Sequence, residues 1–189
     1  MAACLLFFFL FGDITGIPMV NNAYYAVVSV DINPSVEMKI NKNKYVTRVE
    51  VLNQDGYKVA GEYLVGLKVE DAIARIVNKA VKYNYLAEKD TVLLAASVNS
   101  ADGNSAGNSA EEFVTELTKA ELPPEYSYLY LPGDSKDYSK AKEEKLSLGK
   151  YEMMLMTKEK VKPEEVKEMK VKELLEDKEV QSELAEKNP

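Results

Sequence analysis

The residues with the clearest capacity for chemistry are Asn33 and Pro34, in the middle of the segment VSVDINPSVEM (residues 28–38). The carboxamide nitrogen of an asparagine can attack the backbone carbonyl carbon of the same residue, closing a succinimide ring and expelling the next nitrogen. Here that nitrogen belongs to a proline, whose amide has a weakened trans preference, and strain at a fixed kink can raise the energy of the bond. Because holding the reacting atoms close together raises the reaction rate, Asn33 and Pro34 are the candidate self-cleavage pair. Asp31 and Ser35 are candidates to assist them through hydrogen bonds.

A second interpretation of the Asn-Pro pair involves no covalent chemistry. Asn-Pro is typical of turns, and a proline inside a strand pattern marks a break, a bulge or an edge. The chain would then be a non-cleaving extracellular binding or assembly module. Its sheet edge, or the polar loop at residues 100–109, would contact a partner or a glycan. Replacing Asn33 by alanine separates the two hypotheses, because a binding module would keep its function.

Composition removes most conventional catalytic sites. The chain has 189 residues and no histidine, which excludes histidine-based triads and histidine-ligated zinc. Its single cysteine, Cys4, has neither a disulfide partner nor a histidine to activate it. Pairs of acidic residues occur, as in glycosidases, but none stands out by its context. We therefore expect no cofactor, no metal and no turnover enzyme, and a net charge of −7 without a basic patch argues against nucleic-acid binding.

Strand patterns flank Asn33 and Pro34 on both sides. Apolar residues alternate along residues 26–32 and again along residues 35–40. The polar turn NKNK (41–44) then leads to a return strand over residues 45–52. Because the residue before a proline is driven to extended backbone angles, Asn33 is expected at a constrained kink inside a core sheet.

The remaining elements complete an α+β pattern. Helical spacing of apolar residues predicts a helix over residues 70–85 on one sheet face, and the run TVLLAASV (91–98) predicts a strand covered on both sides. We also expect a helix at 111–120, a strand at 126–131 and helices at 138–145, 150–160 and 171–184. Helices this rich in Lys and Glu are usually solvated, although Tyr151, Met154 and Leu155 are expected to pack. The predicted architecture is a mixed β-sheet covered by helices, with a helical C-terminal part.

At these segments the sequence resembles a known family. YYAVVSVDINPSVEM (24–38) is similar to the start of the extracytoplasmic middle domain of RsgI-type anti-sigma factors, which are single-pass membrane regulators of the sigma-I family in Gram-positive bacteria. The resemblance continues in the same order along the chain. It covers VTRVEVLNQDG (46–56), VEDAIARIVNKAVKYNYL (69–86), TVLLAASV (91–98), LGKYEMM (148–154) and VKELLE (171–176).

The resemblance implies a function in signal transduction and transcription regulation. In that family the Asn-Pro bond is associated with autoproteolysis, which carries over to Asn33 and Pro34. A sigma-I-type factor, bound through a cytoplasmic domain that we expect to be absent from this chain, is the implied partner. A membrane protease that carries out regulated intramembrane proteolysis and a cell-wall or polysaccharide signal are further implied partners. The implied location is the cell membrane, with this domain on the extracytoplasmic side.

The expected organisation has three parts. Residues 1–23 contain the apolar run MAACLLFFFLF, which is shorter than the roughly 20 residues that span a bilayer. We interpret it as the outer half of a membrane helix followed by a connector; an uncharged export signal or a buried strand or helix are the alternatives. Residues 24–135 would form the α/β core with the Asn-Pro site. Residues 136–189 would form the C-terminal helical part.

Overall fold

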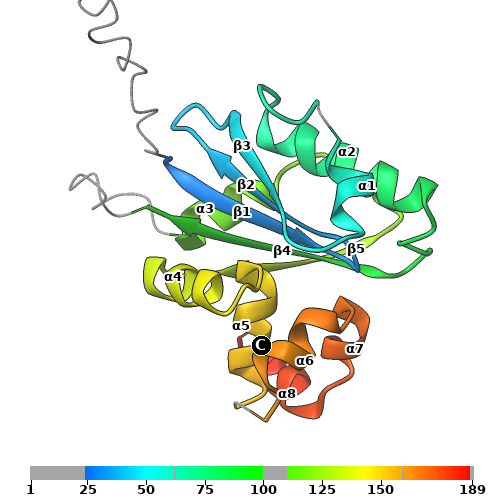
Figure 1. Ribbon diagram of the computed structural model, residues 1–189, viewed down its shortest axis with the longest axis vertical. Helices are drawn as coiled ribbons and strands as arrows, with labels where there is room; N and C mark the ends of the chain where they lie inside the picture. The colour runs from blue at the N-terminus through cyan, green and yellow to red at the C-terminus, as the bar shows by residue number, and fades with distance from the viewer. Residues whose placement is uncertain (1–23, 62, 100–109, 159, 188–189) are drawn as a thin grey trace, which may run out of the picture.

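The structure is a computed structural model that describes residues 24–61, 63–99, 110–158 and 160–187 (Figure 1). The fold is α+β, as the sequence predicts, and the five strands within these ranges form one mixed sheet in the order β3-β2-β1-β4-β5. Only β4 and β5 are parallel. The strands are β1 (Ala26–Asp31), β2 (Ser35–Ile40), β3 (Val46–Val51), β4 (Thr91–Val98) and β5 (Ser127–Pro132). β1, which leads to the Asn-Pro pair, therefore lies in the middle of the sheet.

β1 and β2 form an antiparallel hairpin closed by residues 32–34. Strands on both sides of Asn33 and Pro34 are confirmed, but the expected kink inside the sheet is corrected, since the chain reverses there and the pair lies in a turn at the end of the sheet. Asp31 pairs with Ser35 and Val30 with Val36. This register merges the two alternating apolar patterns onto one face, while proline, which cannot donate to a ladder, stays outside the pairing.

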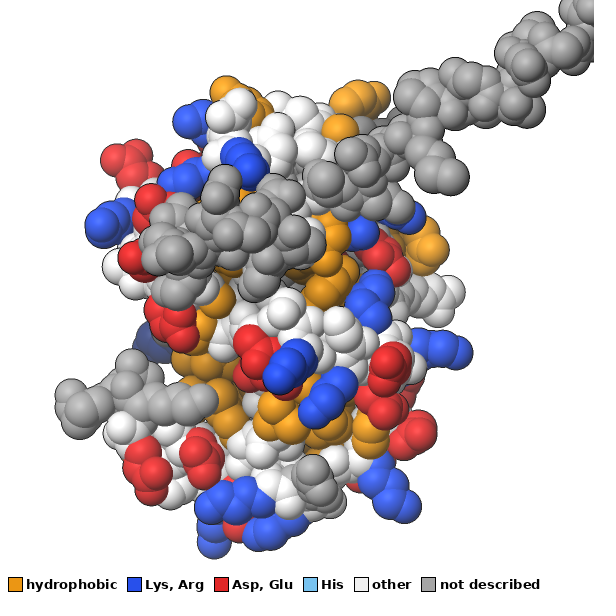
Figure 2. Space-filling model, turned by 90° about the vertical axis from the view of Figure 1, so that its left-hand side faces the viewer, with side chains coloured by type: hydrophobic (Ala, Val, Ile, Leu, Met, Phe, Trp, Pro, Cys, Tyr) orange, Lys and Arg blue, Asp and Glu red, His pale blue; other side chains and the backbone are white. Residues whose placement is uncertain are grey.

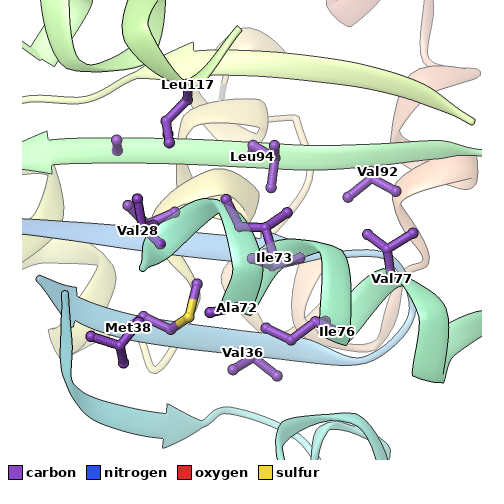
Figure 3. Close-up of a cluster of buried hydrophobic side chains, with 14 of the residues drawn as sticks. Val28, Val36, Met38, Ala72, Ile73, Ile76, Val77, Val92, Leu94 and Leu117 are labelled. Atoms are coloured by element: carbon purple, nitrogen blue, oxygen red, sulfur yellow. The ribbon is translucent and has the colours of Figure 1, made fainter. Parts of the chain in front are cut away.

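Three helices cover that face of the sheet: α1 (Gly56–Ala60), α2 (Val69–Lys82) and α3 (Ala110–Leu117) (Figure 1). The predicted helix over residues 70–85 is confirmed, but it ends at Lys82 because Asn84 has a left-handed φ of 59°. Figure 3 shows side chains of α2, among them Ile73 and Ile76, facing those of the sheet. The buried residues labelled there are Val28, Val36, Met38, Ala72, Ile73, Ile76, Val77, Val92, Leu94 and Leu117.

Five helices cover the opposite face (Figure 1). They are α4 (Ser135–Glu143), α5 (Leu148–Met156), α6 (Pro163–Glu168), α7 (Val171–Leu175) and α8 (Lys178–Lys187). They bury a second apolar cluster with Val27 and Leu93 of the sheet. Tyr151 and Met154 are buried as expected, whereas Leu155 is 37% exposed, so the expectation that it packs is wrong.

One face of the described surface mixes both signs of charge (Figure 2). On the face shown in Figure 2, acidic and basic side chains are interspersed rather than gathered into separate areas. Among the described residues, no helix has the length and apolarity needed to cross a membrane. The apolar run at the start of the chain and the loop at residues 100–109 lie outside the described ranges.

Candidate functional site

A short hairpin turn presents the Asn33–Pro34 bond at one end of the sheet. The N–H of Ile32 donates to the carbonyl of Pro34 at 3.0 Å, which closes the turn. The carbonyl of Ile32 accepts from the N–H of Val171, the first residue of α7, also at 3.0 Å. Pro34 is buried and Asn33 is half-buried. The turn is therefore fixed from within and from the helical C-terminal part.

The carbonyl oxygen of Asn33 has a hydrogen-bond donor directed at it. Asn53, which follows β3, donates from Nδ2 to this oxygen at 2.6 Å. The Oδ1 atom of Asn53 accepts from the N–H groups of Ser35, at 3.1 Å, and Gly56, at 2.9 Å. Because two backbone donors fix the oxygen side of this amide, its nitrogen must face Asn33. A donor on the carbonyl oxygen polarises the carbonyl carbon, the atom that a nucleophile would attack.

The side chain of Asn33 is held by a carboxylate. Its Nδ2 atom donates to Oδ2 of Asp55 at 2.8 Å, and the other oxygen of Asp55 accepts from the hydroxyl of Tyr85 at 2.6 Å. Lys58 donates to the Tyr85 hydroxyl at 2.7 Å, and this contact, aided by Asp55, raises the pKa of Lys58. A carboxylate only accepts, so Asn33 must turn its nitrogen towards Asp55. The atom that would act as nucleophile is thus fixed by a chain of polar contacts.

A glycine allows these groups to approach one another. A Cβ atom on Gly56 would lie 2.8 Å from the carbonyl oxygen of Ser35 and 2.8 Å from Cγ1 of Val51. That oxygen also accepts from the N–H of Leu52 at 3.0 Å. The first residue of α1 therefore packs directly against the hairpin, which brings Asn53 and Asp55 beside the Asn33–Pro34 bond.

Asp31 and Ser35, the predicted assistants, lie differently with respect to Asn33. Ser35 donates its N–H to Asn53, and its buried hydroxyl has no hydrogen-bond partner among the described residues. The Asp31 carboxylate is fully buried on the face of the sheet covered by the helical C-terminal part, where a Cβ atom on Gly149 would lie 2.7 Å from Oδ2. No hydrogen bond within the described chain joins Asp31 to Asn33. Their assisting roles stay predictions.

The buried carboxyl of Asp31 has an unusual titration. Burial raises its pKa, and the nearby hydroxyl of Ser35 and the charge of Lys150 oppose the rise only in part. Neither carboxylate oxygen has a hydrogen bond of ordinary geometry within the described chain. The folded state therefore holds the Asp31 proton to a higher pH than the unfolded state does. Stability from this group is fully present below the ordinary aspartate pKa of about 4 and is lost as the pH rises through the raised pKa.

Asp31→Asn should remove this loss of stability at higher pH, because asparagine has the shape of aspartate and never becomes charged. We expect the variant to gain free energy of unfolding relative to the starting protein as the pH rises from about 4 towards neutrality. Urea unfolding at several pH values measures the difference, in chains that also carry Asn33→Ala so that none of them can be cut. Asp71→Asn, at an exposed position of α2, is the control, because it removes a carboxylate that is not buried. A difference for Asp31→Asn that does not change with pH would contradict the assignment.

No metal site accompanies the Asn-Pro turn. Within the part of the chain that the structure describes, no three Cys, Asp or Glu side chains are arranged to hold an ion. The groups described beside the Asn33–Pro34 bond are backbone and side-chain amides, the Asp55 carboxylate, the Tyr85 phenol, the Lys58 ammonium and the buried Ser35 hydroxyl.

Sequence reasoning missed Asn53, Asp55 and Tyr85. From its residue types alone the segment NQDG (53–56) predicts only a turn, and the position of Tyr85 at the end of a predicted helix favours packing. Asp55 is 22 residues from Asn33 and 30 residues from Tyr85, and no periodicity connects positions so far apart. The available signal was that NQDG ends one of the segments, VTRVEVLNQDG, that carry the family resemblance.

Comparison with known proteins identifies relatives over most of the chain. Residues 25–156 match the model of a family described as the anti-sigma factor RsgI-like central domain. Anti-sigma-I factor RsgI9 of Acetivibrio thermocellus is 31% identical over 98% of the chain, and anti-sigma-I factor RsgI4 of the same species is 32% identical over 69%. Anti-sigma-I factor RsgI of Bacillus subtilis is 27% identical over 80% of the chain. The chain spans only 28%, 26% and 39% of the lengths of these three relatives.

Proposed function

We propose, since this chain belongs to the family of RsgI-like anti-sigma factors through its central domain, that it is the extracytoplasmic signalling domain of a membrane-bound anti-sigma factor. In this proposal the domain cleaves itself between Asn33 and Pro34, and the two fragments stay associated. A mechanical or carbohydrate-derived signal then separates them. Intramembrane proteolysis follows and releases a sigma-I-type factor on the other side of the membrane.

The observation that carries the proposal is the place of the Asn33–Pro34 bond. It closes the turn after β1, and β1 is paired on both edges, with β2 and with β4. Asn33 lies with its carboxamide nitrogen and its carbonyl oxygen both held by fixed partners, Asp55 and Asn53. A bond held in this way is a better candidate for intramolecular attack than an Asn-Pro pair in a free loop.

Retention of the fragments follows from the same placement. After cleavage the N-terminal fragment would keep β1 in the middle of the sheet, with Val27, Val28, Val30 and Ile32 buried. Their burial contributes roughly 6–12 kcal/mol at about 1.5–3 kcal/mol per side chain. Further hydrogen bonds tie this fragment to the rest, such as the one from the Gly149 N–H to Ser29 Oγ at 3.0 Å. A cut domain is therefore expected to remain one particle until force or unfolding separates the strands.

The purified chain should give two results that differ with the conditions. Under denaturing conditions, mass spectrometry should detect two fragments, one ending at Asn33 and one beginning at Pro34. Under native conditions, the same sample should elute as a single species that contains both. If the denatured sample shows only the full-length mass at all times after synthesis, the self-cleavage proposal is wrong, and the non-cleaving binding module becomes the better interpretation.

A further inference from the structure

Asp55 occupies a helix N-cap position but does not use its side chain to cap the helix. It is the N-cap residue of α1, and N-cap side chains normally accept hydrogen bonds from the first N–H groups of their own helix. The Asp55 side chain makes no such bond. Its two oxygens instead accept from Asn33 Nδ2 at 2.8 Å and from the Tyr85 hydroxyl at 2.6 Å. The carboxylate is therefore directed at the self-cleavage turn and away from its own helix.

We propose that Asp55 is the general base of the self-cleavage reaction and that Asn53 stabilises the negative charge which develops on the carbonyl oxygen of Asn33. The inference rests on the self-cleavage proposed above. Both residues touch reacting atoms: Asp55 contacts the attacking nitrogen, and Asn53 contacts the carbonyl oxygen at 2.6 Å.

The reaction balances without any outside reagent. As the bond between Asn33 Nδ2 and the Asn33 carbonyl carbon forms, one proton of Nδ2 passes to the Asp55 carboxylate, and the carbonyl electrons move onto the oxygen. When the carbonyl re-forms, the bond to the Pro34 nitrogen breaks, and that nitrogen receives the proton from Asp55. The products are a succinimide at Asn33 and a free secondary amine at Pro34. Hydrolysis of the succinimide then consumes one water molecule.

Asn53 is oriented for its role before the reaction begins. Its oxygen is occupied by the N–H groups of Ser35 and Gly56, so its nitrogen cannot rotate away from Asn33 without losing both bonds. A donor fixed in advance costs no reorganisation when charge develops, which makes such groups effective in catalysis.

Tyr85 and Lys58 act through Asp55 and are positioning residues. Tyr85 donates to the Asp55 oxygen that does not contact Asn33, and Lys58 donates to the Tyr85 hydroxyl at 2.7 Å. The Lys58 ammonium also lies 3.7 Å from the same Asp55 oxygen. These contacts hold the carboxylate in one orientation, with Oδ2 free to face Asn33.

The ordinary alternative is that these polar groups only attach α1 to the hairpin. The two roles make opposite predictions for substitutions of Asp55. If only the packing of α1 against the hairpin matters, Asp55→Asn should be better tolerated than Asp55→Glu, because asparagine has the size of aspartate and its one oxygen can still accept from Asn33. If a carboxylate is needed to take the proton, Asp55→Glu should retain more cleavage than Asp55→Asn.

The experiment follows fragments after cell-free synthesis of the full chain in a pulse–chase format. Asp55→Asn should lower the first-order rate constant of cleavage by about a hundredfold or more, the usual contribution of a general base. Asp55→Glu should be affected less. Asn53→Asp, which keeps the accepting oxygen and removes the donor, should lower the rate by a factor on the order of 10² to 10³. The exposed control Asp71→Asn should cleave at the starting rate.

Each outcome supports or contradicts the inference. If the starting protein cleaves and Asp55→Asn cleaves equally fast, the base is not Asp55, while the proposed function stands. If Asp55→Asn cleaves faster than Asp55→Glu, the role of Asp55 is structural. Should the Asp55 variants fail to fold, Tyr85→Phe provides the test, because a slower reaction with an unchanged unfolding midpoint requires a role in positioning. A starting protein that never cleaves contradicts both the inference and the proposed function.

Discussion

Replacing Asn33 by alanine is expected to leave the chain as one covalent piece. Alanine has no carboxamide nitrogen, so the attack on the Asn33 carbonyl carbon loses its nucleophile, and we expect complete loss of cleavage. The fold should survive because the Asn33 side chain is half-buried and the structure gives it one hydrogen bond, to Asp55. Mass spectrometry of the denatured chain measures the result directly.

A matched control separates this effect from a general effect of removing an asparagine. Asn43→Ala changes an exposed residue in the turn between β2 and β3, at the other end of β2 from the Asn-Pro bond, and should leave cleavage unchanged. A fragment that still ends at residue 33 in the Asn33→Ala chain would show that the nucleophile is not the asparagine side chain.

The sequence predicts the elements around the site better than the contacts within it. The strands over residues 26–32 and 35–40 can be predicted because the alternation of side chains along a strand depends only on near neighbours in the sequence. The reversal at Asn33 and Pro34 is a different matter, because the same alternation fits a kinked strand and a hairpin equally well. Only the pairing of Asp31 with Ser35 decides between them, and pairing is a property of the folded sheet.

Local sequence patterns cannot predict the polar contacts of the site, for a similar reason. Asp55 meets Tyr85 because α2 lays its C-terminal end beside the start of α1, and no spacing within either segment encodes that approach. The sequence does show that NQDG and its flanks resemble a known domain. This resemblance indicates that the segment matters, but it does not say which atoms of the segment contact Asn33.

The C-terminal helices show a second limit. Their Lys and Glu content favours solvated helices, and most of their side chains are exposed or half-buried. α6, α7 and α8 nevertheless place one or two aliphatic residues each in the second apolar cluster, namely Val166, Val171, Leu174 and Val180, all 1% exposed or less, whereas α5 is buried along nearly its whole length. α7 and α8 are also separate helices, where one continuous helix over 171–184 was expected; the break falls at residues 176–177.

Leu174→Ala is expected to cost about 2–5 kcal/mol of unfolding free energy. Leu174 is fully buried in α7, which packs against β4 and α8. Removing its side chain leaves a cavity between the sheet and the helical C-terminal part. Urea unfolding should be measured in the Asn33→Ala chain. A cut protein separates into two fragments on unfolding, so its apparent stability would depend on protein concentration; the uncut chain avoids this.

Leu155→Ala is the matched control, since it removes the same atoms from a leucine that is 37% exposed, and should cost under about 1 kcal/mol. Equal losses for the two variants would show that α7 is not anchored to the sheet. The result also bears on the proposed release of the N-terminal fragment, because the N–H of Val171 in α7 donates to the carbonyl of Ile32, one residue before Asn33. If α7 is anchored as the structure indicates, its hydrogen bond to Ile32 ties the C-terminal end of the N-terminal fragment to the helical C-terminal part. A substitution that loosens α7 should then make that fragment easier to release from the cut domain.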